Sequence, residues 1–325
     1  MTAWFIEAAG YCAVDVYGMI SGYVGFGHKH KFSGFLQMYL QVVFYTVLLT
    51  GIFALVQPEA VAGQTVTQVL FPFAYSTYWY YTAYFCLFFF MPVLDRLMET
   101  LERAEAEKML WLAYLLFGVL QTIFYKQFAG TSSGFSFLWL MVMYLTGAYI
   151  RKYDIGKTGR WKYLAGYFLC ALAAWGAKIG PELLRFNSTG EYVPAERSLN
   201  LTSPFIIPCA FFLLVFFKEV HCGARIEKFV RTFTPSTFDV YLFHDSPLIR
   251  ETFLSWKFTG LRARPLPLMV LGRVASGVLI WLLGNLVGLA RIRLFGLLHI
   301  GQFCKWTDEA IQKLAAKKNS PAEGE

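Results

Sequence analysis

Charged side chains are scarce in this chain, where they make up 15 % of the 325 residues, against about 25 % in soluble domains. Hydrophobic residues account for 57 %. This composition leaves too little polar surface to cover a water-soluble globule. We therefore expect lipid to surround most of the chain.

Cysteine patterns and leader signals are also lacking. The six cysteines include no CxxC pair, so the sequence predicts no disulfide framework, no zinc site and no other metal site. The first ten residues lack a basic segment and contain Glu7, so no cleavable signal peptide is indicated.

Long apolar runs are what the chain has instead. About 20 apolar residues cross a bilayer and about 17 are the minimum, which predicts an all-α, polytopic transmembrane helical bundle of about nine spans in residues 1–290. Residues 291–325 are expected to form a cytoplasmic amphipathic tail that is disordered at its end. The spans are expected near 5–26, 34–56, 76–94, 109–129, 134–150, 161–180, 203–220, 235–255 and 266–290.

Lysine and arginine alternate between the two sets of loops, with 20 on one side and 5 on the other. This bias predicts that the basic side and the C-terminus are cytoplasmic. It also assigns the net charge of +8 to contact with anionic headgroups of the bilayer and not to nucleic acid. Met1 then falls outside the cell just before the first span. One additional upstream helix would return the N-terminus to the cytoplasm, so we expect that a first span is absent from this sequence.

Four cations remain inside the predicted spans, where each costs roughly 3 kcal/mol on insertion scales. We predict that they bind an anionic acceptor such as a lipid-linked sugar phosphate, because arginine clamps phosphate with two hydrogen bonds. For the two lysines, snorkelling to the headgroups is the alternative. The four cations are Lys126, Lys178, Arg250 and Arg273.

The densest polar cluster inside a span runs from Tyr241 to Pro247 and contains His244 and Asp245. Histidine is the usual general base near neutral pH, so we predict His244 and Asp245 as catalytic residues. Neighbours on a helix point about 100° apart, so Asp245 is not a simple orienting partner for His244. The alternative is a structural kink at Pro247. The other acidic residues inside spans are Glu7, Asp15, Asp239 and Glu251.

The first span ends with small residues and is followed by a basic cluster. Gly18 and Gly22 predict close helix packing. The cluster contains His28, Lys29 and Lys31, which we predict to meet the phosphates of a nucleotide donor. Contact with anionic lipid is the alternative.

Several stretches, in order over roughly residues 7–290, resemble acyltransferase family 3, the bacterial multi-pass enzymes that transfer acyl groups onto surface polysaccharides. The first stretch contains Asp15, Ser21 and Gly22, and the second runs from Trp79 through Tyr84. The others are residues 137–153, 203–204 and the segment from Ser236 to Asp245. Each motif alone is weak, whereas the ordered set is fairly specific.

The resemblance implies ten helices in a bacterial cytoplasmic membrane and transfer of an acyl group, mostly acetyl, from acetyl-CoA to a glycan hydroxyl. No bound cofactor is expected. The family's first helix carries an Arg and a His associated with catalysis, and this chain begins at the counterpart of the second helix. Two other functions therefore stay open: a transporter or flippase for lipid-linked glycans, and an inactive, truncated acyltransferase homologue.

Overall fold

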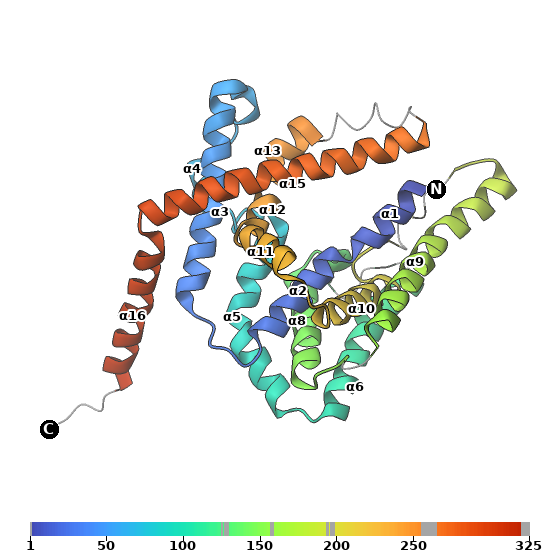
Figure 1. The fold of residues 1–325 in the computed structure, drawn as a ribbon, viewed down its shortest axis with the longest axis horizontal. Helices are drawn as coiled ribbons and strands as arrows, with labels where there is room; N and C mark the ends of the chain where they lie inside the picture. The colour runs from blue at the N-terminus through green and yellow to red at the C-terminus, as the bar shows by residue number, and fades with distance from the viewer. Residues whose placement is uncertain are drawn as a thin grey trace. The chain divides into compact units, whose positions relative to one another are not determined.

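The computed structural model describes residues 2–124, 126, 130–156, 159–192, 195, 199–254 and 265–319. Over these ranges the secondary structure is helical and contains no strand (Figure 1), which confirms the predicted all-α helical bundle. The chain divides into two compact units. Unit 1 comprises residues 1–29 and 83–221, and unit 2 comprises residues 30–82 and 222–325.

Unit 1 is built around the crossing of α2 (Ala13–Gly25) and α8 (Phe137–Lys152), which pack closely through glycine. A Cβ atom at Gly22 would overlap the carbonyl oxygen of Tyr144, and one at Gly147 would overlap that of Met19. Only glycine allows the two backbones to approach this closely. The helices of unit 1 are α1 (Thr2–Tyr11), α2 (Ala13–Gly25), most of α5 (Trp79–Thr100), α6 (Arg103–Tyr114), the π-helical turn η2 (Leu115–Val119), α7 (Leu120–Phe124), η3 (Ser132–Gly134), α8 (Phe137–Lys152), α9 (Arg160–Thr189) and α10 (Ile206–Lys218).

Unit 2 contains the two helices that carry most of the polar side chains discussed below, α3 and α12. α12 packs against α15, and α16 packs against α3. α16 turns away from α15 at His299, which adopts a φ of 54° (Figure 1). The elements of unit 2 are α3 (Phe32–Val56), η1 (Pro58–Ala60), α4 (Val66–Leu70), α11 (Ala224–Phe233), η5 (Thr234–Ser236), α12 (Thr237–His244), α13 (Pro247–Ile249), the π-helical turn η6 (Arg250–Leu254), α15 (Leu266–Leu297) and α16 (Ile300–Asn319).

Five helices of the described residues are long and apolar enough to cross a membrane: Phe32–Val56, Trp79–Thr100, Arg103–Phe124, Arg160–Thr189 and Leu266–Leu297. Each coincides with one of the nine predicted spans. Ile206–Lys218 is a shorter apolar helix, and α8 has 16 residues. The multi-pass membrane character is therefore supported, while the count of nine spans stays a prediction.

Two predicted spans are interrupted. The first is split between α1 and α2 at Cys12. The span predicted near 235–255 is split after His244, where Ser246 takes an extended ψ of 128° before Pro247, as the residue before proline generally does. The kink that was the alternative interpretation of this segment is therefore present.

The boundary between the predicted domain and tail falls inside a helix, because α15 continues to Leu297. Arg291, which was assigned to the tail, is 5 % exposed within unit 2. α16 follows as a separate helix. The stretch predicted to be disordered, residues 319–325, lies outside the described residues apart from Asn319.

Candidate functional site

A buried ion pair joins α12 to α15 in unit 2. The guanidinium of Arg291 donates from Nη2 to Oδ2 of Asp239 at 2.6 Å and from Nε to Oδ1 at 3.1 Å. Arg291 is 5 % exposed and Asp239 is fully buried. Charges in an apolar environment persist only when they are paired and hydrogen-bonded in this way.

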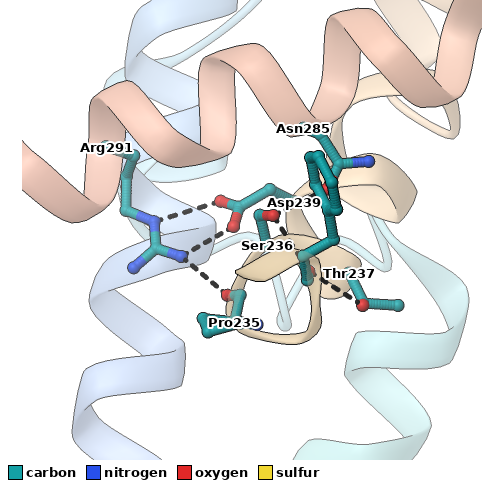
Figure 2. Close-up of polar contacts among 7 residues, drawn as sticks. Pro235, Ser236, Thr237, Asp239, Asn285 and Arg291 are labelled. Atoms are coloured by element: carbon teal, nitrogen blue, oxygen red, sulfur yellow. Dashed lines mark hydrogen bonds and ion pairs between the residues drawn. The ribbon is translucent and has the colours of Figure 1, made fainter. Parts of the chain in front are cut away.

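A second polar contact lies beside this pair. The hydroxyl of Ser236 donates to Oδ1 of Asn285 at 2.6 Å, and Asn285 donates to the carbonyl oxygen of Trp281. Figure 2 shows Asp239 directed at the guanidinium of Arg291, with Ser236 and Asn285 close by. A Cβ atom at Gly288 would lie 2.7 Å from the Cβ atom of Ser236, so this glycine allows α15 to approach α12.

A cavity of about 390 Å³ lies at the Asp245 end of α12 and is called the Asp245 cavity below. Its lining residues include Thr50, Gln64, Gln68, Tyr75, Trp79, Asp245 and Arg250. Arg250 pairs with Asp245 at 3.3 Å, and Thr50 donates to Gln64 at 2.9 Å. Amides, hydroxyls and aromatic rings around one concave surface are the groups that hold small polar ligands.

Another cavity, of about 440 Å³, lies at the Pro235 end of α12 and is called the Arg291 cavity below. Gln37, Met38 and Gln41 of α3 line it together with Arg291 and Phe295 of α15. α3 lines the Asp245 cavity as well, through Thr46, Leu49 and Thr50. The α3–α12 pair therefore reaches from one cavity to the other.

His244 is half-buried at the end of α12, and its Nδ1 lies 2.7 Å from the carbonyl oxygen of Val240. A carbonyl accepts only, so in the neutral imidazole Nδ1 carries the proton and Nε2 has the lone pair. Asp245 follows the helix as its C-cap residue, and its ion pair is with Arg250. Asp245 lines a cavity, whereas His244 is not among the lining residues of either one.

The family comparison decides the class of protein. A model described as an acyltransferase domain matches residues 1–287. The chain belongs to acyltransferase family 3. No curated protein and no solved structure matches it. The matched range includes α12 and the whole lining of the Asp245 cavity, but it ends before Arg291.

The four cations predicted to bind an acceptor are in different settings in this acyltransferase. Arg250 lines the Asp245 cavity, whereas Arg273 is exposed on α15 and Lys126 is exposed in unit 1. Lys178 is buried, with its Nζ 3.1 Å from Glu182 and 3.9 Å from the centre of the Trp4 ring. Lys178 is thus already neutralised by a carboxylate of its own helix.

The basic cluster predicted to bind the donor is exposed in the acyltransferase at His28, Lys29 and Lys31. His28 Nδ1 lies 3.3 Å from the carbonyl oxygen of Phe26. Lys31 is the N-cap residue of α3, where the N–H of Ser33 donates to Asp308 of α16 at 3.0 Å. The N-terminus of α3 is therefore already covered by a carboxylate.

The motif residues lie in unit 1. Asp15 is fully buried, and its Oδ1 accepts a hydrogen bond from the indole N–H of Trp139 at 2.9 Å. Ser21 donates to the carbonyl oxygen of Tyr17, and Tyr84 is half-buried on α5. Gly22 lies at the α2–α8 crossing, and the structural role of the motif stays a prediction.

Sequence reasoning missed Gln41, Asn285 and Arg291 as candidate site residues, and it noted Asp239 without assigning it a role. The last apolar run contains a pattern that indicates the role of Asn285 and Arg291. Gly284, Gly288 and Arg291 follow one another at spacings of four and three residues, and Asn285 adjoins this stripe. Residues at these spacings lie on one face of a helix, so the pattern indicates that the helix continues past residue 290.

Proposed function

We propose that this acyltransferase transfers an acyl group, acetyl in the simplest case, from acyl-CoA to a hydroxyl group of a cell-surface or lipid-linked glycan. The observation that carries the proposal is the pair of cavities at the two ends of α12, both lined by α3, in unit 2. The acyl donor and the glycan acceptor each need a binding site, and the α3–α12 pair reaches from one cavity to the other.

The Asp245 cavity suits the acceptor. Glycans present hydroxyl groups, which both donate and accept hydrogen bonds, and ring faces that pack on aromatic side chains. Gln64 and Gln68 offer amides, and Trp79 offers an aromatic face in this cavity. Arg250 would hold the phosphate of a lipid-linked acceptor.

The lysine and arginine bias orients the proposal. It places Lys31, at the start of α3, in the cytoplasm and the end of this helix outside. The Arg291 cavity then faces the cytoplasmic supply of acyl-CoA, and the Asp245 cavity faces the outer side of a bacterial cytoplasmic membrane. The C-terminus is cytoplasmic in this arrangement.

The proposed step is acyl transfer by addition and elimination. The acceptor oxygen attacks the thioester carbonyl carbon while its proton passes to the free Nε2 of His244. The C–S bond then breaks, and the proton leaves with the CoA thiol. The hydrogen bond to Val240 holds His244 in the tautomer that this role requires.

The test is transfer by the purified chain in proteoliposomes supplied with radiolabelled acetyl-CoA and a panel of glycans that includes lipid-linked oligosaccharides. We expect label in the glycan and a reduced rate for His244→Ala. Absence of transfer across the whole panel would refute the proposed function. Unchanged turnover of the variant would assign His244 to packing alone.

A further inference from the structure

The Arg291 cavity contains a buried amide whose N–H donor group has no acceptor in the described part of the chain. Gln41 is 8 % exposed, and its Nε2 has no hydrogen-bond partner in the described part of the chain. A buried donor without an acceptor costs free energy that a folded protein normally avoids. Because Gln41 lines the cavity, a ligand there would satisfy this group.

A second donor faces the same space. Arg291 uses Nε and Nη2 for Asp239 and the carbonyl oxygen of Pro235. Nη1 makes no hydrogen bond within the described ranges, and Figure 2 shows it directed away from the carboxylate. Since Asp239 already neutralises the guanidinium charge, a neutral carbonyl oxygen suits Nη1 as a partner.

Apart from Gln37, the rest of the lining consists of apolar side chains, Pro235 and glycines. Met38, Ile292 and Phe295 provide apolar surface. Gly34, Gly296 and Gly301 also line the cavity, and a Cβ atom at any of them would meet open space. The cavity therefore fits a slim aliphatic chain that carries amides.

We infer that the Arg291 cavity binds the pantetheine arm of the acyl-CoA donor. The carbonyl oxygens of its two amides accept from Gln41 Nε2 and Arg291 Nη1, and its methylene groups lie against Met38 and Phe295. The thioester end of the donor is then free to extend along α12 toward His244. The inference rests on the proposed function and identifies the donor site within it. The ester oxygens of a phospholipid also accept hydrogen bonds, so the test below includes lipid as a competitor.

Part of this site lies beyond the acyltransferase domain. The family match ends at residue 287, whereas Arg291, Phe295 and Gly301 follow it. Gly301 belongs to α16, which is anchored to the start of α3 by the bond from Ser33 to Asp308. The C-terminal helix pair thus completes a donor site that the matched domain alone leaves open.

The test is calorimetric binding of S-acetonyl-CoA, a ketone analogue that cannot transfer its acyl group, to the full chain in nanodiscs. Gln41→Leu should weaken binding about 5- to 10-fold, the worth of one neutral hydrogen bond. The same variant should unfold at a higher temperature, because it removes an unmet buried amide. Gly34→Leu should fill the cavity and abolish binding, whereas Gly51→Leu, in open space on the same helix, should bind like wild type.

The outcomes separate two failures. If wild type binds the analogue and the Gln41 and Gly34 variants bind it equally well, the cavity assignment is wrong while the proposed function stands. If wild type fails to bind it, the donor of the proposed function is wrong as well. Displacement of the analogue by phosphatidylglycerol and not by free pantetheine would assign the cavity to lipid and overturn the inference.

Discussion

Arg291 and Asp239 face each other through two hydrogen bonds, of 2.6 and 3.1 Å, with both side chains almost completely buried. Removal of one partner leaves an uncompensated buried charge, which costs about 3–5 kcal/mol. We expect Asp239→Leu to lower the unfolding temperature in detergent sharply and Asp239→Leu with Arg291→Met to recover most of the loss. A double variant whose loss equals the sum of the two single losses would show that the pair is not coupled.

Gly288 determines how closely α15 approaches α12. A side chain there would meet Ser236 and Asp239, so Gly288→Val should destabilise unit 2 by about 1–3 kcal/mol through overpacking. Gly277→Val is the matched control, because a Cβ atom at Gly277 on the same helix meets open space. Equal thermal stability of the two variants would contradict this crossing.

Lys178 is predicted to act in stability and not in acceptor binding. Its ion pair with Glu182 is buried, at 1 % and 4 % side-chain exposure, so Lys178→Ala should lower the folded yield and the unfolding temperature. Arg185→Ala, an exposed cation of the same helix, should change neither. If the Lys178→Ala variant kept full stability and showed a raised KM for the acceptor, Lys178 would instead be an acceptor-binding residue.

The reactivity of the Cys304 thiol shows whether α16 stays packed against α3. Burial, with the negative charge of Asp308 as a second cause, raises the pKa of its thiol, so less thiolate is present at neutral pH. Among single-cysteine variants, Cys304 should react with maleimide far more slowly than the exposed Cys222 and should speed up as the pH rises. Asp308→Asn should accelerate Cys304, because it removes the negative charge, while the amide oxygen of asparagine still accepts from Ser33. Equal rates for Cys304 and Cys222 would mean that α16 is not packed as described.

The sequence predicts the helical class and the long spans well, because about 20 apolar residues in a row leave few other structures available in lipid. It predicts the span near 235–255 poorly, because whether Pro247 bends or breaks a helix depends on neighbours that the sequence does not show. The sequence pattern predicts Arg291 in the tail, because a cation after an apolar run usually marks a membrane boundary. Its partner Asp239 is 52 residues away, and only the fold brings the two together.

The candidate site was predicted in part. The position of Arg250 and Asp245 inside a predicted span makes them candidates, and they line one cavity together. Lys178 was selected by the same argument, but it lies against Glu182 one helical turn away. Glu182 lies beyond the end predicted for that span at residue 180, so this i, i+4 ion pair appears only because α9 continues to Thr189.

The most direct test of the account is the rate of acetyl transfer as a function of acceptor concentration for wild type, Arg250→Ala and Arg231→Ala. Arg231 pairs with Glu227 on the exposed α11, where an ion pair contributes little. The account predicts that Arg250→Ala raises the acceptor KM about 10-fold or more, as loss of a charged hydrogen bond does, while Arg231→Ala matches wild type. Identical kcat/KM for Arg250→Ala and wild type would contradict the Asp245 cavity as the acceptor site.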